Sequence, residues 1–410
     1  MSGELLKIAM LSVHSCPVGN LGAKDTGGMS VYIRELAREL GGKGHLVDVY
    51  TRVHDQNDPQ VVDLGHNARL IHLRVGDDTR IEKLALYTHL PDFACSLENY
   101  CQQNNQRYDI IFSHYWLSAL VGEYLKNWWH IPHLTMFHTL GAVKNTFNIG
   151  SEETELRIET EKSLARNCDR IIAATPVEKE YLTHLYTATP ERIEVIPCGV
   201  NLQLFYPRGK RISRQRLGLT DDKVLLFVGR IDPLKGINQL IKALPLLQNG
   251  QKRRLLIVGG DEDSRAEIAT LQGLTQELKV QDSVSFLGTI KHEQLPYYYS
   301  AADLCVMPSY YESFGMVALE ALACGTPVVA TDVGALKSII RQGETGYVVT
   351  DNSPRQLAGQ IELLLNHPIT ELKSVMAMRE SVSQYGWANI AEAIVRECHR
   401  ALAHAGAVIA

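Results

Sequence analysis

The sequence predicts an α/β protein built from two doubly wound halves that face each other across a cleft. Apolar runs of strand length alternate with segments of helical length along most of the chain, as in parallel sheets covered by helices. At 410 residues the chain is too long for one ordinary hydrophobic core. A polar, irregular stretch at 202–222 separates two such series. We interpret it as an exposed linker, with a docking patch as the alternative.

The expected strands are short and apolar in both halves. In the first half they are Lys7–Val13, Leu46–Tyr50, Arg69–Arg74, Asp109–His114, His133–Thr139, Arg170–Ala174 and Glu194–Pro197. In the second half they are Val224–Gly229, Leu255–Gly259, Val284–Leu287, Leu304–Met307, Val328–Thr331 and Tyr347–Val349. We therefore expect an N-terminal domain at 1–205 and a second domain at 206–385. A C-terminal helix at 386–410 is expected to pack back toward the first domain.

Composition excludes several classes of function. Apolar residues make up 45% of the chain and charged residues 21%, as in a soluble globular protein. A net charge of −5 leaves no basic excess to neutralise nucleic-acid phosphates. The eight cysteines contain no Cys-x-x-Cys pair, which favours buried free thiols in a reducing cytoplasm. Neither a signal peptide nor an apolar run long enough to form a transmembrane segment is present, so a cytoplasmic location is expected.

The stretch from Met307 to Asp332 carries the most specific signal. Glu312 lies on a polar turn after a predicted strand, and Glu320 lies about two turns into the helix that follows. The backbone N–H groups near Phe314 and Gly315 are unpaired at the helix N-terminus, where they can bind phosphate oxygens. The two acidic side chains then suit hydroxyl groups. Phosphate and hydroxyls together suggest a sugar nucleotide.

Two further loops fit the same ligand. Gly27 and Gly28 follow the first strand and open a helix, so their N–H groups can approach an anion closely. A plain tight turn explains this pair equally well, and the G-x-G-x-x-G pattern of dehydrogenases is absent. Arg230 and Lys235 follow the first strand of the second half, where two cations can clamp a diphosphate. A surface loop is the alternative for this pair.

The order and spacing of Arg230-x4-Lys235-Gly236 and Glu312-x7-Glu320 resemble glycosyltransferase family 4 over essentially the whole chain. Within that family the chain is most similar to the transferases that act on inositol phosphate, through 25–33, 113–118, 137–145 and Thr175-Pro176. It shares Asp25-Thr26-Gly27-Gly28 with sucrose and sucrose-phosphate synthases. The resemblance implies the GT-B fold, in which two Rossmann-like domains face each other.

The resemblance also implies roles on the donor side. Glu320 would hold the ribose hydroxyls and Glu312 a hydroxyl of the donor sugar. Backbone N–H groups near Phe314 and Gly315, with Arg230 and Lys235, would bind the diphosphate. The remaining implied donor-side and catalytic residues are Gly27 and Gly28, which approach from the other domain, and His138, which faces the donor sugar and the acceptor.

On the acceptor side, the resemblance implies that Lys83, Tyr115, Thr139 and Arg157 hold an acceptor phosphate. Ser30 stands where the inositol-phosphate enzymes usually carry Asn, close to the acceptor. Ser30 is therefore expected to be an acceptor-binding residue, and the departure bears on which acceptor is used.

Three histidines lie at or near predicted strand ends, where cleft residues sit. For His14 and His114 we expect a solvated or backbone-bonded side chain. For His138, flanked by Phe137 and Thr139 in the matching motif, we favour a functional role. Asp261-Glu262-Asp263 has the composition of a metal-binding triplet, but a solvated loop is favoured. We expect that no metal ion or other cofactor is required.

The resulting hypothesis is a retaining transfer of a sugar from a nucleoside-diphosphate donor to a small, phosphorylated polyol or sugar. By resemblance the donor is UDP-linked. No pair of carboxylates is poised as nucleophile and acid, so the departing diphosphate is expected to help take the acceptor proton. Three alternatives stay open: a lipid-directed family 4 transferase, a UDP-sugar epimerase with the same architecture, and a non-catalytic nucleotide-sugar binder. A homodimer is also left open.

Overall fold

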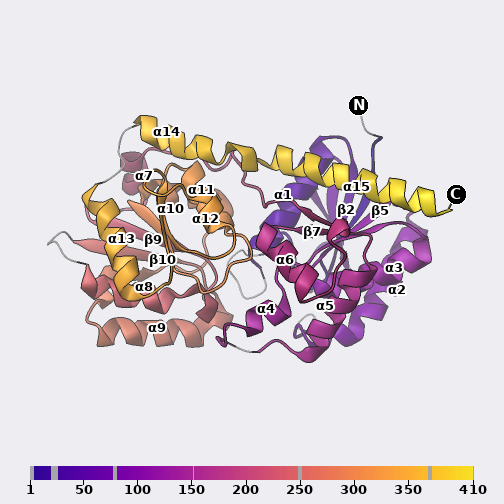
Figure 1. The fold of residues 1–410 in the computed structure, drawn as a ribbon, viewed down its shortest axis with the longest axis horizontal. Helices are drawn as coiled ribbons and strands as arrows, with labels where there is room; N and C mark the ends of the chain where they lie inside the picture. The colour runs from indigo at the N-terminus through magenta and orange to yellow at the C-terminus, as the bar shows by residue number, and fades with distance from the viewer. Residues whose placement is uncertain are drawn as a thin grey trace.

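The computed structural model describes residues 4–19, 26–76, 81–150, 152–247, 252–367 and 372–409. Across these ranges the chain forms two parallel α/β halves placed side by side, as Figure 1 shows. The predicted fold class is therefore confirmed. Every expected strand is present, with bounds that differ from the expected ones by at most a few residues.

The first sheet has the strand order β3-β4-β2-β1-β5-β6-β7-β8 in the described residues, and β3 alone is antiparallel to its neighbour. Residues alternate between its two faces, so Ile8 and Met10 pack with helix α1 while Ala9 and Leu11 pack with α2 and α3. The strands are β1 (Lys7–Leu11), β2 (Leu46–Arg52), β3 (Val61–Gly65), β4 (Ala68–Leu73), β5 (Ile110–His114), β6 (His133–Met136), β7 (Arg170–Ala173) and β8 (Ile193–Val195).

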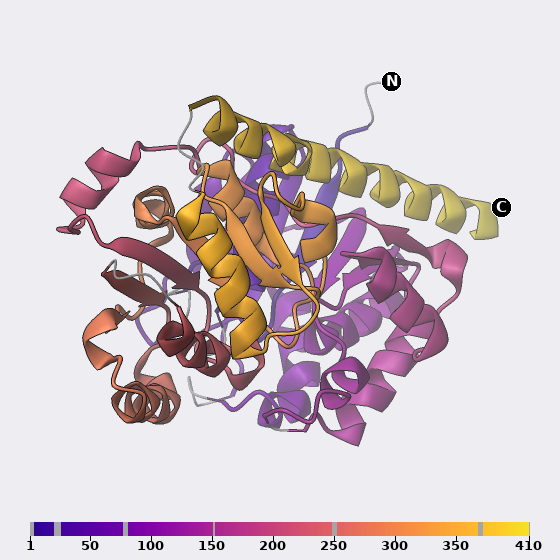
Figure 2. The same cartoon turned by 60° about the vertical axis from the view of Figure 1, so that its left-hand side comes forward.

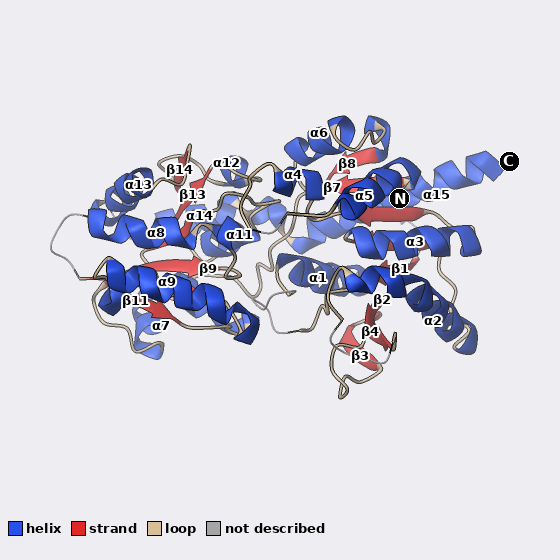
Figure 3. Ribbon diagram, turned by 90° about the horizontal axis from the view of Figure 1, so that it is seen from below, coloured by secondary structure: helices blue, strands red, loops and turns tan. Residues whose placement is uncertain are grey.

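Strand β3 was not predicted. Its sequence is Val-Val-Asp-Leu-Gly, and only Leu64 is buried, because β3 is an edge strand with one neighbour. The helices of this half cover both faces of the sheet (Figure 3). They are α1 (Gly28–Gly42), η1 (Ala85–His89), α2 (Leu90–Gln103), α3 (Trp116–Trp129), α4 (Gly141–Asn145), α5 (Glu155–Asn167), α6 (Pro176–His184) and η2 (Pro190–Arg192).

The second sheet is parallel throughout its described strands, in the order β11-β10-β9-β12-β13-β14. The strands are β9 (Lys223–Val228), β10 (Arg253–Val258), β11 (Val284–Phe286), β12 (Leu304–Met307), β13 (Val328–Thr331) and β14 (Gly346–Val349). The helices are α7 (Lys210–Arg216), η3 (Pro233–Lys235), α8 (Ile237–Ala243), η4 (Leu244–Leu246), η5 (Glu262–Ser264), α9 (Arg265–Glu277), η6 (Gln281–Ser283), η7 (His292–Gln294), α10 (Leu295–Ala301), α11 (Met316–Ala323), α12 (Leu336–Ile339) and α13 (Pro354–Asn366).

The segment interpreted as an exposed linker is partly structured and docked. It contains α7, and the Arg214 Nη2 of that helix lies 2.7 Å from Asp303 Oδ2. Lys210 Nζ lies 2.6 Å from the other oxygen of the same carboxylate. The basic cluster of this stretch is therefore partly used inside the molecule, which corrects the interpretation of a simple linker.

The chain crosses between the halves twice, and the two crossings hydrogen-bond to each other. The N–H group of Val200 donates to the carbonyl of Tyr385 at 2.8 Å. Gly199 passes so close to Trp387 that a Cβ at position 199 would lie 2.5 Å from the indole ring. The last elements are α14 (Leu372–Ser381), η8 (Ser383–Tyr385) and α15 (Trp387–Ile409).

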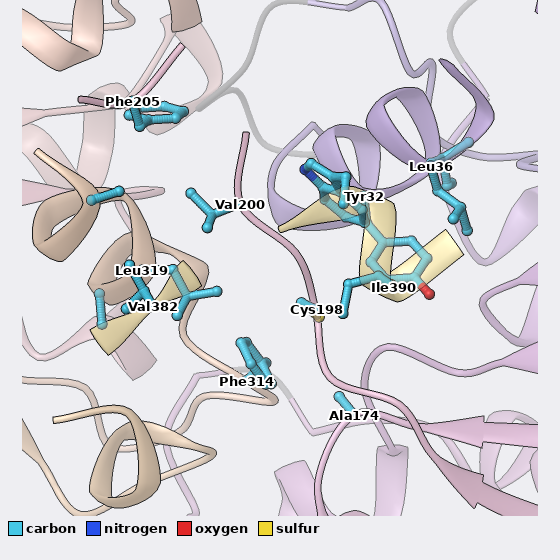
Figure 4. Close-up of a cluster of buried hydrophobic side chains, with 14 of the residues drawn as sticks. Tyr32, Leu36, Ala174, Cys198, Val200, Phe205, Phe314, Leu319, Val382 and Ile390 are labelled. Atoms are coloured by element: carbon cyan, nitrogen blue, oxygen red, sulfur yellow. The ribbon is translucent and has the colours of Figure 1, made fainter. Parts of the chain in front are cut away.

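Helix α15 returns along the first half, where it runs beside α1 (Figures 1 and 2). Lys43 Nζ of the first half lies 2.9 Å from Glu392, and Arg170 Nε donates to Glu397 at 2.8 Å. Hydrophobic packing continues through the junction, where side chains of both halves and both crossings meet (Figure 4). They include Tyr32, Leu36, Cys198, Val200, Phe314, Leu319, Val382 and Ile390.

All eight cysteines lie in the described residues and are free thiols, and seven of them are buried. None of the helices in the described part of the chain combines the length and apolar character needed to cross a membrane. The cytoplasmic location and the oligomeric state stay predictions.

Glu178 is a buried acid in the first turn of α6, close to Cys198 of the junction between the halves. Its N–H group donates to Thr175 Oγ1 at 3.0 Å, and its Oε2 accepts from the Ala174 N–H at 2.7 Å. The other oxygen, Oε1, is buried without a hydrogen-bond partner among the described residues. Burial raises the pKa of Glu178 to about 7.

This shift predicts a measurable effect of pH on stability. A carboxyl whose pKa is raised on folding stabilises the fold most below its unfolded value of 4.5, and that contribution is lost as the pH rises through about 7. In the wild type, this residue should lower the free energy of unfolding by about 1–3 kcal/mol between pH 5 and pH 8. In Glu178→Gln we expect this contribution to be absent, so the free energy of unfolding falls less over the same range. Urea unfolding at both pH values measures this slope. An unchanged slope in the variant would contradict the assignment.

Candidate active site

The cleft between the two sheets holds a cavity of about 360 Å³. It lies at the carboxyl ends of the strands, since His138 follows β6, Arg230 follows β9 and Ser309 follows β12. Doubly wound sheets bind their ligands at this edge. All of the predicted site residues except Ser30 line the cavity, namely Gly27, Gly28, Lys83, Tyr115, His138, Thr139, Arg157, Arg230, Lys235, Glu312, Phe314, Gly315 and Glu320.

The glycine turn of the first half lies directly against the second half. A Cβ on Gly27 would lie 3.6 Å from Arg230 Cδ, and a Cβ on Gly28 would lie 3.0 Å from Met316 Cε. A side chain at position 28 would therefore press on the first residue of α11. Because neither glycine has a side chain, the N-terminus of α1 can lie close to Arg230 and to α11.

Lys235 and Glu312 form an ion pair at the cavity wall. The Lys235 Nζ lies 2.7 Å from Glu312 Oε1, and Ser309 Oγ donates to the same oxygen at 2.9 Å. Lys235 ends the short helix η3, whose N-cap Asp232 accepts from the Leu234 N–H at 2.9 Å. A diphosphate that recruits the lysine ammonium must therefore share it with Glu312.

Helix α11 begins at the cavity because of Gly315. This residue has a φ of 108°, and a Cβ there would lie 2.7 Å from Leu336 Cδ2, so both conformation and space require glycine. The first N–H groups of a helix lack intrahelical partners, and here they face the cavity beside Phe314 and Met316. The positive end of the helix dipole adds to this preference for anions.

Glu320 lies one turn further along α11 and is held by two side chains that the sequence analysis missed. Tyr299 Oη donates to Glu320 Oε2 at 2.7 Å, and His292 Nε2 lies 3.1 Å from Oε1. On its other side, His292 Nδ1 lies 3.1 Å from the Nη2 of Arg34, on helix α1. A guanidinium can only donate, so Nδ1 accepts and the Nε2–H donates to Glu320.

This chain of contacts links helix α1 of the first half to the carboxylate expected to hold the ribose. Neither Arg34 nor His292 belongs to a local motif, because they meet only when the two halves come together. The sequence alone therefore held no signal for either residue.

His138 lines the cavity from a strained three-residue turn. Its φ is 61°, which is uncommon for a residue with a side chain, and the Thr139 N–H donates to the Phe137 carbonyl at 2.7 Å. His138 Nε2 lies 3.0 Å from His114 Nδ1. Burial lowers the pKa of His138 to about 3, so the imidazole is neutral at physiological pH.

The expectations for the other two histidines were wrong. His14 is 8% exposed, lines the cavity and packs its ring 4.3 Å from that of Tyr115, so it is not solvated. His114 is fully buried and bonds to the side chain of His138, neither to solvent nor to the backbone. Burial lowers the pKa of both well below the ordinary value.

The predicted acceptor-phosphate residues lie close together in the cavity wall. The Arg157 guanidinium lies 4.8 Å from the centre of the Tyr115 ring, and Lys83 Nζ lies 5.8 Å from the same ring. Arg157 Nη2 donates to the Thr139 carbonyl at 2.9 Å and to its Oγ1 at 3.0 Å. Lys144 is a further cation that lines the cavity.

The predicted acceptor role of Ser30 is not supported by its position. Ser30 is fully buried in α1, and its Oγ lies 2.8 Å from that of Ser15, on the side facing the loop after β1. Its neighbours Met29 and Val31 line the cavity, while Ser30 does not. Asp25, the first residue of the glycine motif, lies outside the described residues.

Asp261 of the candidate metal triplet has a structural role. Its Oδ1 accepts from the Ser264 N–H at 3.1 Å and from the Ser264 Oγ at 2.9 Å, which caps η5. Among the described residues, no group of three or more His, Cys, Asp and Glu is placed to hold a metal ion.

Comparison with known proteins assigns the fold and family. The model of "Glycosyltransferase Family 4" matches residues 26–204, and that of "Glycosyl transferases group 1" matches 209–386. The D-inositol 3-phosphate glycosyltransferase of Corynebacterium diphtheriae is 38% identical over 94% of this chain and 93% of its own. That of Thermobispora bispora is 37% identical over 93% and 91%.

Among solved structures, the sucrose-phosphate synthase of Thermosynechococcus elongatus is 37% identical, with a TM-score of 0.89 and coverage of 97% of this chain and 100% of that chain. HepE of Anabaena, solved with UDP and glucose, has a TM-score of 0.75 over 95% and 98% of the two chains. At 19% identity that likeness concerns the fold alone. The chain is a glycosyltransferase with the GT-B fold and belongs to glycosyltransferase family 4.

Proposed function

We propose that this glycosyltransferase transfers a sugar from a nucleoside-diphosphate donor to a hydroxyl of a small phosphorylated polyol or sugar. The donor that we propose is a UDP-sugar. The observation that carries the proposal is a cavity lined by cationic groups from both halves of the chain. Arg230, Lys235 and the N-terminus of α11 belong to the second half, and Lys83, Lys144 and Arg157 belong to the first. Two anionic groups, a diphosphate and a phosphate, would leave the reacting atoms near His138 between them.

Retention of the anomeric configuration is part of the proposal. Among the described residues that line the cavity, four are carboxylates, and each has a partner in this structure: Asp232 caps η3, Glu312 pairs with Lys235, Glu320 is held by His292 and Tyr299, and Glu153 pairs with Lys144. This favours a front-side reaction over a covalent glycosyl-enzyme. The acceptor hydroxyl attacks the anomeric carbon as its bond to the diphosphate breaks, and the diphosphate oxygen takes the hydroxyl proton.

The protein then contributes orientation and charge stabilisation. Negative charge grows on the leaving diphosphate, close to Arg230, Lys235 and the N–H groups of α11. Neutral His138 suits a hydrogen bond to a sugar hydroxyl, because its lowered pKa leaves it uncharged. These cations replace a divalent metal in the proposal.

The acceptor class follows from the cations around Arg157 and from the relatives. D-inositol 3-phosphate and sucrose-phosphate enzymes are similar to this chain at nearly equal identity, and both names denote phosphorylated compounds. An epimerase would need no second ligand beside the donor, and the cluster at Arg157 therefore favours a transferase. No feature of the described residues favours a lipid acceptor.

The proposed function is tested by an activity matrix of donors and acceptors. UDP-glucose, UDP-N-acetylglucosamine and the matching ADP and GDP sugars are each combined with inositol phosphate, fructose 6-phosphate and their dephosphorylated forms. We expect transfer only with a phosphorylated acceptor, and an NMR spectrum of the product with the donor's anomeric configuration. Conversion of the donor without any acceptor would instead support the epimerase.

Replacing Lys235 by Ala removes one of the charges proposed to stabilise the leaving group. We expect kcat to fall by about 100-fold or more, because the lost interaction strengthens in the transition state. Steady-state kinetics of Lys235→Ala are compared with those of Lys242→Ala, which removes a solvent-exposed cation from α8. Near-normal turnover of Lys235→Ala would remove this residue from the proposed clamp.

Turnover is also expected to persist when divalent metals are chelated. Arg230 and Lys235 carry the charge that a metal would otherwise supply, and Asp261 is engaged with Ser264. The rate is measured with millimolar EDTA and again after magnesium is added. Complete loss of activity with EDTA, reversed by magnesium, would contradict this prediction and make Asp261 and Asp263 candidate metal ligands.

A further inference from the structure

The predicted acceptor-phosphate residues include an arginine whose nitrogen atoms are all engaged. Arg157 is 2% exposed, and its Nε donates to Glu161 at 2.7 Å. Its Nη2 donates to the carbonyl and hydroxyl of Thr139, and its Nη1 lies 2.9 Å from Glu153 Oε2. These contacts account for four of the five N–H groups, so a phosphate that binds two adjacent nitrogens of Arg157 at once must displace one of these partners.

The two carboxylates on Arg157 differ in how firmly they are held. Glu161 is fully buried, and it also accepts from the Gly141 N–H at 2.9 Å and from Tyr186 Oη at 2.8 Å. Its removal would leave several buried donors unpaired, at a high cost in free energy. Glu153 has a side chain that is 21% exposed and lines the cavity. Of the two, Glu153 is the one that an incoming ligand can replace.

Glu153 also pairs with a second cation that lines the cavity. Its Oε1 contacts the Nζ of Lys144, so one carboxylate occupies Lys144 and Arg157 together. Burial opposes the ionised form, yet Arg157 and Lys144 outweigh it and lower the pKa of Glu153. The side chain is therefore an anion at physiological pH. An anion with two oxygens on two cations has the arrangement that a bound phosphate would adopt.

The backbone of Glu153 is fixed while its side chain reaches into the cavity. The Glu153 N–H donates to Asn145 Oδ1 at 2.7 Å, and the Asn145 Nδ2 donates to the Glu153 carbonyl at 2.9 Å. Asn145 follows Lys144 at the end of α4, so the carboxylate and its two cations are tied to one short stretch of chain. A rotation of the side chain alone is enough to release Lys144 and the Nη1 of Arg157.

We propose that the carboxylate of Glu153 occupies the position at which the acceptor's phosphate binds, and that it is displaced when a phosphorylated acceptor binds. This inference rests on the proposed function, because it assigns the step by which that acceptor enters. A phosphate group carries more charge and more acceptor oxygens than a carboxylate, so it can compete for the two cations. A neutral hydroxyl compound cannot. Glu153 thereby sets the affinity for the acceptor and excludes unphosphorylated analogues.

The first test measures phosphate binding without any turnover. Inorganic phosphate is titrated into wild type, Glu153→Gln and Glu152→Gln, and thermal unfolding is followed. Glu152→Gln is the matched control, because it removes the same charge from the exposed neighbouring residue. We expect the half-maximal phosphate concentration to fall about fivefold or more in Glu153→Gln alone, as removal of a competing charge predicts. The predicted donor-binding residues are identical in all three proteins, so a difference between them arises at Glu153.

The second test uses the acceptor found in the activity matrix. Glu153→Gln is expected to lower the KM for the phosphorylated acceptor at least about fivefold and to leave the KM for the donor unchanged. Phosphate affinity that is unchanged or weaker in Glu153→Gln would overturn the proposal and make Glu153 a support for Arg157. If no acceptor is found, the proposed function fails, while the phosphate titration still decides the role of Glu153.

Discussion

The hydrogen bond between the Val200 N–H and the Tyr385 carbonyl joins the two places where the chain passes between its halves. The cleft depends on this junction, because the hydrogen bond and the apolar side chains packed around it hold the two halves together. The bare backbone of Gly199 lets Trp387 pack against the same crossing, and Trp387 in turn contacts Tyr32 with ring centres 5.3 Å apart. Helix α15 then ties the far end of the chain to the first half. We expect any opening of the cleft to rotate about this junction.

The chemistry of the cleft follows from charges that both halves supply. The second half provides Arg230, Lys235 and the N-terminus of α11, and the first half provides the cations around Arg157. His138 lines the same cavity and is neutral at physiological pH because it is buried. The contacts from Arg34 through His292 to Glu320 connect helix α1 of the first half to helix α11 of the second.

Sequence patterns predicted the parts of this molecule that depend on local chemistry. Strand β1 and helix α11 follow from the apolar run at the start of the chain and from the turn at Gly315 that precedes the helix. Almost all of the predicted site residues came together because parallel strands place their ends at one edge of a sheet. The edge strand β3 escaped prediction because only one of its five residues is buried.

The errors arose where tertiary packing decides the outcome. His14 and His114 sit beside other aromatic rings that no local pattern reveals, and Ser30 turns toward Ser15 although both neighbours in α1 line the cavity. Lys144 lies within a segment that already matched the family pattern, so its place in the cavity could have been foreseen. Glu153 could not, because its role depends on the geometry of the cations around it.

A crystal structure of the protein with bound UDP would test the central claim most directly. We predict that the diphosphate lies between Arg230, Lys235 and the N-terminus of α11, close to Gly28, with the ribose hydroxyls on Glu320. A nucleotide bound outside this cavity, or one whose phosphates contact none of these groups, would contradict the account.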